Sequence, residues 1–93
     1  MTTTMNVPKS TEAFVVDGGL AVAFELILAG RVVRCTVSRE LLKDYFWLQP
    51  GADDARVLKV FNDGRQRIVA VAERKARRLA APSIQLEATD LQR

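Results

Sequence analysis

Residues 22–37, VAFELILAGRVVRCTV, constrain the fold of this chain more than any other stretch. Two runs of apolar and β-branched residues flank a glycine at position 30, which is the pattern of a β-hairpin. Side chains alternate between the two faces of a strand, so the pairing must keep the apolar residues of both strands on one face. That face consists of Val22, Phe24, Leu26, Leu28, Val33, Cys35 and Val37.

The same parity limits the length of the hairpin loop. A two-residue loop at 30–31 pairs Leu28 with Val33, and a loop at 29–30 preserves the parity. A three-residue loop would set apolar residues against polar ones. We therefore predict a two-residue primed turn that uses Gly30.

Shorter sequence patterns on both sides of the hairpin predict a further strand, a turn and a helix. Residues 14–16 form a candidate strand, and the Asp-Gly-Gly sequence at 17–19 is typical of a turn. Ser38 suits the N-cap of a helix over 39–48, which Pro50-Gly51 would stop.

A longer helix is predicted after Asp53 or Asp54, either of which can cap it. The triplet at 62–64 has turn character, but the apolar phase of the helix continues through it. We therefore expect one continuous helix, with Gly64 marking close packing on the sheet, that ends before Pro82.

Alternating residues at 83–87 predict a closing strand. The expected order is strand, strand, helix, helix, strand, with 14–16 as a possible extra first strand. This order predicts an α+β two-layer sandwich, in which a three- or four-stranded antiparallel sheet packs against two helices. We expect a flexible leader at 1–12 and a single α+β domain at 13–93.

Composition indicates a globular protein in a reducing compartment. Of the 93 residues, 48% are hydrophobic and 27% are charged. No apolar run approaches the roughly 20 residues that a membrane helix needs, and the first residues do not resemble a signal peptide. One cysteine cannot build an internal disulfide framework. We expect a cytoplasmic protein that does not bind a membrane.

One set of residues shares its order and spacing with a known family: Val22, Ala23, Phe24, Gly30, Val33, Cys35, Val37, Ser38, Leu41, Leu42, Phe61, Arg65, Ile68, Ala72, Glu73, Lys75, Ile84, Leu86 and Asp90. This pattern resembles a family of small bacterial proteins catalogued as domain of unknown function 1488. The resemblance implies a small α+β fold with an antiparallel sheet packed on helices, and it implies no activity or catalytic residue. It is weakest in the Arg-rich segment 74–78 and in the approach to the last strand.

The chain has few residues suited to catalysis. It contains no histidine and no nucleotide-binding or nucleophile-elbow motif. Cys35, on the apolar face, is expected to be an inert buried thiol, and Lys75 is expected to extend its stem past the sheet edge rather than to react. Glu40 and Asp44 suit a solvated helix face. We predict no catalytic residue, no metal site, no cofactor and no enzymatic activity.

Basic residues concentrate in one segment. Residues 53–80 hold eight basic and four acidic side chains. On one continuous helix, Arg56, Arg67, Arg74 and Arg78 would lie within about 40° of each other. Such a row of arginines can bind phosphates, so nucleic-acid binding is an alternative function; a solvated helix face is the simpler explanation, which we favour.

Two other features indicate a protein partner. Trp47 follows Tyr45 and Phe46 on a short helix, so it either projects as an anchor for a partner or packs under the 50–51 loop. The second face of the sheet is too apolar for plain solvent and too polar for a core. Our leading hypothesis is a non-enzymatic accessory module that forms a homodimer or docks on another protein. Its candidate contact residues are Ala21, Ala23, Ile27, Val32 and Trp47.

Overall fold

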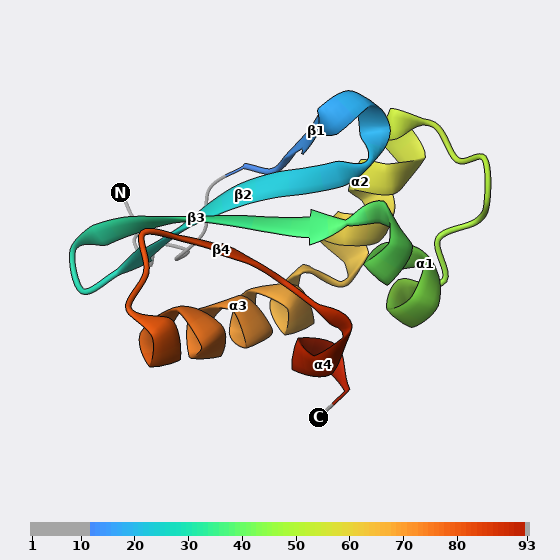
Figure 1. Cartoon of the computed structure of the whole chain (residues 1–93). Coiled ribbons are helices and arrows are strands. Elements are labelled where there is room, and N and C mark those ends of the chain that lie inside the picture. Colours follow the sequence, from blue (N-terminus) through green and yellow to red (C-terminus); the bar gives the residue numbers. More distant parts are fainter. Residues whose placement is uncertain (1–11, 93) are drawn as a thin grey trace, which may run out of the picture.

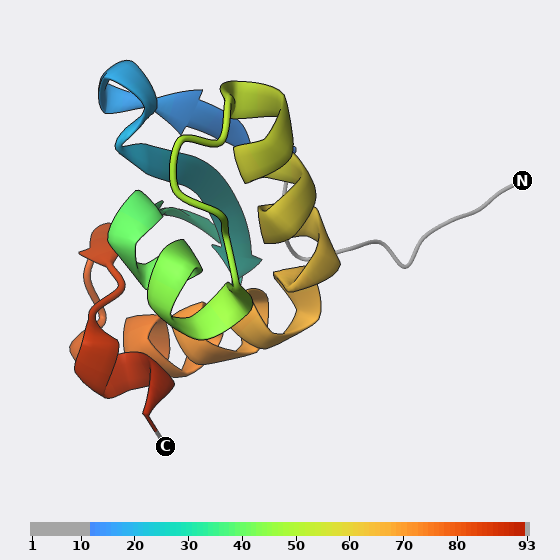
Figure 2. The ribbon, with the colours of Figure 1, turned by 90° about the vertical axis from the view of Figure 1, so that its right-hand side faces the viewer.

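The computed structural model describes residues 12–92, so the predicted leader at 1–12 lies outside the described residues apart from Glu12. One sheet forms the first layer, and helices lie against one of its faces (Figures 1 and 2). The elements are β1 (Phe14–Val16), the 3-10 turn η1 (Asp17–Gly19), β2 (Ala21–Leu28), β3 (Arg31–Ser38), α1 (Arg39–Phe46), α2 (Asp54–Asp63), α3 (Arg65–Leu79), β4 (Ser83–Gln85) and α4 (Ala88–Leu91).

The central hairpin confirms the prediction of a two-residue primed turn. Leu28 pairs with Arg31 across a loop of Ala29 and Gly30. Both loop residues have positive φ, 51° and 79°, as a type I′ turn requires. The loop therefore occupies 29–30 rather than 30–31, and Leu26 pairs with Val33. The parity is unchanged, and the predicted apolar face is buried.

Two shorter strands complete the sheet, in the order β1-β2-β3-β4. The possible first strand exists, since β1 pairs antiparallel with β2. β4 pairs with β3 in parallel, so the prediction of an entirely antiparallel sheet is wrong. The reason is that the intervening helices return the chain to the hairpin end, where β3 also starts (Figure 1).

Helix α1 begins as the sequence predicts. The Ser38 hydroxyl accepts a hydrogen bond from the backbone N–H of Leu41, 3.1 Å away. The helix ends at Phe46, two residues before the predicted end, because Trp47 adopts a left-handed conformation with φ of 62°. The C-terminal stop is therefore built into the backbone at Trp47 rather than imposed by Pro50.

The predicted continuous helix is wrong, because the structure breaks it at Gly64. Asp53 caps α2, accepting from the Arg56 backbone N–H at 2.9 Å, and Gly64 ends this helix. Helix α3 then leaves in a different direction (Figure 2). Gly64 does mark a close approach, but to the ring of Phe46 on α1 and not to the sheet.

The core lies between the inner sheet face and the helices. The rings of Phe24 and Phe61 meet there with centroids 5.2 Å apart. Helix α4 was not predicted, since the alternation at 83–87 indicates only a strand. It adds Leu91 to the core and lies beside α3 (Figure 1).

Replacing Gly64 with alanine tests the packing at the helix break. Glycine to alanine within a helix ordinarily stabilises by about 1 kcal/mol. Here a Cβ would lie 2.5 Å from Cδ1 of Phe46, so we expect Gly64→Ala to destabilise the protein by about 1–3 kcal/mol in urea unfolding. A Gln66→Ala control on exposed α3 surface should be neutral or stabilising. Stabilisation by Gly64→Ala would contradict the observed packing.

Candidate functional site

Within residues 12–92, no helix covers the sheet face that points away from the core (Figures 1 and 2). The strand register shows which side chains lie on this outer face. It places Phe14, which was not among the predicted contact residues, beside Ala23. Phe14, Ile27 and Val32 are 56%, 47% and 53% exposed. The outer face includes Phe14, Val16, Ala21, Ala23, Glu25, Ile27, Val32, Arg34, Thr36, Ser83 and Gln85.

The four predicted contact residues of the sheet differ in accessibility. Ile27 and Val32 are direct cross-strand partners and form one apolar pair near the hairpin turn. Ala23 is half-buried and lines a shallow depression of about 410 Å³. Ala21 is only 9% exposed, so it offers a partner little surface.

One opposite-charge pair lies in the middle of the outer face. Glu25 and Arg34 are register partners, and Oε2 of Glu25 lies 3.7 Å from Nε of Arg34. The Arg34 side chain is 79% exposed, so solvent screens this pair and its contribution to stability is small. The outer face thus contains both signs of charge between apolar ends.

Trp47 projects from the protein with 84% of its surface exposed, as one of the two sequence alternatives predicts. It lines a groove of about 630 Å³ together with Pro50, Arg56 and Val60. None of the sheet's contact residues lines this groove. The structure therefore places the five predicted contact residues on two separate surfaces.

The predicted row of arginines is not one surface. Arg56 lies on α2, whereas Arg67, Arg74 and Arg78 lie on α3. Arg67 is engaged, with its guanidinium 5.3 Å from the Phe46 ring centroid and 2.9 Å from the carbonyl of Leu91. Only Arg74 and Arg78 share one cavity.

Cys35 is fully buried, and burial raises the pKa of its thiol to about 12. Its Sγ lies 3.7 Å from the carbonyl of Val33. Such a thiol stays protonated at neutral pH and is a poor nucleophile. Glu40 and Asp44 lie on a solvated helix face, as predicted, since both are exposed and Glu40 lies 3.7 Å from Lys43.

Lys75 neither extends freely past the sheet edge nor lies unpaired in the core. Its Nζ donates to Oδ2 of Asp90 and to the carbonyl of Gln85, both at 2.8 Å. The Lys75 and Asp90 side chains are only 11% and 12% exposed. This ion pair joins α3 to α4. Sequence analysis missed the role of Asp90, because its partner is fifteen residues away and nothing local predicts α4.

Opposing effects act on the pKa of Asp90. Burial alone would raise it, but hydrogen bonds from Lys75 and from the Glu87 backbone N–H, with the charges of Lys75 and Arg78, hold it below its usual value. The carboxylate therefore stays ionised at neutral pH and compensates the Lys75 ammonium. A lowered folded-state pKa stabilises the protein above the unfolded-state pKa, and this stabilisation is lost as the pH falls through the folded-state value.

We expect Asp90→Asn to destabilise the protein at pH 7 by about 2 kcal/mol, since it removes the close counter-ion of a nearly buried ammonium and leaves only the exposed Glu87 carboxylate, 4.0 Å away. The difference from the parent protein should shrink in acid, below the ordinary aspartate pKa of about 3.9. Urea unfolding at pH 7 and in acid measures the free energy of unfolding of both proteins. Asp63→Asn, in an exposed pair with Lys59, is the matched control and should cost under about 0.5 kcal/mol. Equal losses in the two variants would contradict a special role for Asp90.

Comparison with known proteins supports the resemblance noted in the sequence. A family model described as "Protein of unknown function (DUF1488)" matches residues 12–85, although Leu86 and Asp90 of the quoted pattern lie beyond its end. No curated protein and no solved structure matches the chain. Among the described helices, none is long and apolar enough to cross a membrane. Because the match spans most of the sequence, the chain belongs to the DUF1488 family.

Proposed function

We propose that this protein is a non-enzymatic, cytoplasmic interaction module that forms a homodimer through the outer face of its sheet. The observation that carries the proposal is the apolar surface on that face, where Phe14, Ile27 and Val32 are each about half exposed. Exposed apolar side chains at both ends of a sheet face that no described helix covers are typical of an interaction surface.

The charge pattern favours a second copy of this chain as the partner. Two-fold interfaces are self-complementary, so each charge must meet its opposite across the axis. On the outer face, Glu25 and Arg34 are neighbours of opposite sign. Consider a two-fold axis that lies between the two sheets, parallel to the strands and midway between β2 and β3. Rotation about this axis places Glu25 of one copy against Arg34 of the other. Two sheets packed in this way form a sandwich about 10 Å thick.

The size of the surface indicates a reversible contact. At a rise of about 3.4 Å per residue and a spacing of about 4.8 Å, the four strands offer a flat footprint of about 350 Å². A standard interface buries about 800 Å² on each partner. The homodimer should therefore form weakly, at micromolar concentration, which suits an accessory role.

Two other partners remain outcomes of the test. The groove beside Trp47 and Arg56 offers an aromatic anchor to a different protein, independently of the sheet. Nucleic-acid binding by Arg56, Arg67, Arg74 and Arg78 has less support than the sequence indicated, since these residues lie on two helices and Arg67 is engaged within the protein.

Sedimentation velocity over a concentration series tests the dimer. We expect a monomer–dimer equilibrium that Ala23→Glu weakens by at least about tenfold, because it would bury an unpaired carboxylate. The depression at Ala23 leaves room for the new side chain in the monomer. Ala70→Glu, on the exposed surface of α3, is the matched control and should leave association unchanged.

Charge reversal adds a second comparison. Arg34→Glu should weaken the dimer, and the double variant Glu25→Arg/Arg34→Glu should restore it, because swapped signs remain self-complementary. A protein that stays monomeric throughout the concentration series, or equal effects of Ala23→Glu and Ala70→Glu, would contradict the proposal.

A further inference from the structure

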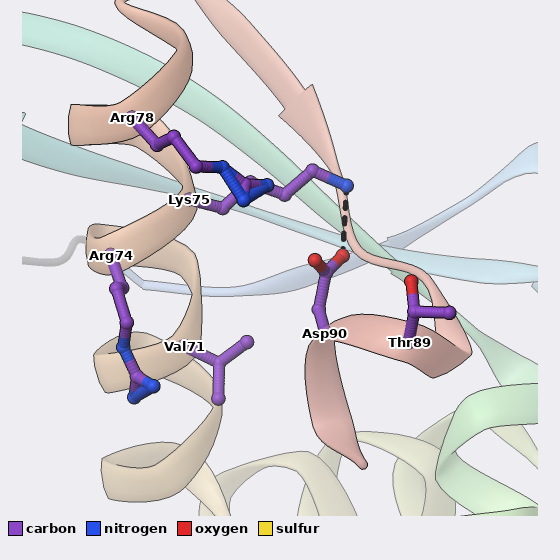
Figure 3. A pocket seen from close by; sticks show the side chains of 6 residues that line it. All are labelled: Val71, Arg74, Lys75, Arg78, Thr89 and Asp90. Atoms are coloured by element: carbon purple, nitrogen blue, oxygen red, sulfur yellow. Dashed lines mark hydrogen bonds and ion pairs between the residues drawn. The ribbon is translucent and has the colours of Figure 1, made fainter. Parts of the chain in front are cut away.

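A cavity of about 510 Å³ lies between α3 and the short C-terminal helix α4. Figure 3 shows Arg74, Lys75 and Arg78 extending from α3, with Asp90 of α4 facing Lys75 and Thr89 lying farther from α3. The cavity shares no lining residue with the outer face of the sheet, and it does not depend on the proposed dimer. Its volume is in the range of small-molecule sites.

The cavity has an excess of positive charge. Arg74, Lys75 and Arg78 contribute three positive charges to its lining, and Asp90 contributes one negative charge. The Asp90 carboxylate is already occupied by the Lys75 ammonium at 2.8 Å. The charge of Arg78 also acts on this carboxylate, so the lining as a whole keeps two net positive charges.

These two guanidinium groups have no hydrogen-bond or ion-pair partner within residues 12–92. Their neighbour Arg77, which does not line the cavity, does have one, since it donates to Glu73 at 2.9 Å. Among the arginines of α3, Arg65, Arg67 and Arg77 have hydrogen-bond partners. The two arginines of this helix without one in the described part of the chain both line the cavity.

The lining also provides donors besides the two guanidinium groups. An ammonium has three N–H groups, and Lys75 uses two of them for Asp90 and Gln85. The Thr89 hydroxyl is a further donor at the opposite wall. Because the Lys75–Asp90 pair fixes α4 against α3, these donors are held in place before any ligand arrives.

We propose that this cavity binds the phosphate group of a small molecule, with Arg74 and Arg78 as its principal ligands. Guanidinium groups form paired, charge-assisted hydrogen bonds with phosphate oxygens, and arginines at positions i and i+4 of a helix lie on the same side. A phosphate dianion matches the two charges that remain in the lining. Inorganic phosphate and a nucleoside monophosphate carry the same group and differ in what the rest of the cavity must accommodate.

Binding is measured by amide chemical-shift changes of Thr89 and Asp90 during titration at low salt, with inorganic phosphate and with a nucleoside monophosphate. We expect Arg74→Gln and Arg78→Gln each to weaken binding by about 10-fold or more. Arg77→Gln is the matched control and should have no effect. Tighter binding of the nucleotide would identify it as the better model of the ligand, and equal affinities would identify the phosphate alone as the recognised group.

Three outcomes would overturn the proposal. One is the absence of saturable phosphate binding by the folded parent protein. Another is an equal loss of binding in Arg77→Gln, which would indicate a nonspecific basic surface. The last is binding of a single-stranded oligonucleotide by the protein when neither inorganic phosphate nor the nucleoside monophosphate binds. That result would favour a nucleic-acid surface instead.

Discussion

The antiparallel pairing of β2 with β3 is the constraint on which the rest of this structure depends. A two-residue turn at Ala29 and Gly30 fixes the register, and the register decides which face is apolar. A slip by one residue would move every apolar side chain of a strand to the outer face. In the observed register, all these apolar side chains lie on the inner face of the sheet. Phe24 therefore contacts Phe61, and the helices cover one continuous apolar surface.

The close approach of Gly64 to Phe46 organises the helical layer. It allows α2 and α3 to follow different directions while both bury apolar side chains, among them Phe61 and Ile68. This break also redistributes the basic residues. Arg67 packs over Phe46 and holds the carbonyl of Leu91, so a residue that resembles a ligand for phosphate serves the packing of the C-terminus.

The two surfaces with functional potential differ in their physical basis. The outer face offers apolar area with balanced charge, which favours a second copy of the chain over a strongly charged partner. The cavity between α3 and α4 offers uncompensated positive charge beside an ion pair that is already satisfied, which favours an anion. They share no residue, so one can be altered without the other.

The sequence by itself determined the features that depend on near neighbours: the hairpin and its parity, the cap at Ser38, an aspartate cap at 53 or 54, the burial of Cys35 and the family. These follow from alternation, turn chemistry and capping, which act over a few residues. Tertiary structure alone decided the parallel direction of β4, because alternating residues look the same in either direction. It also decided the break at Gly64 and the Lys75–Asp90 pair, since the contacts with Phe46 and α4 join residues far apart in the chain.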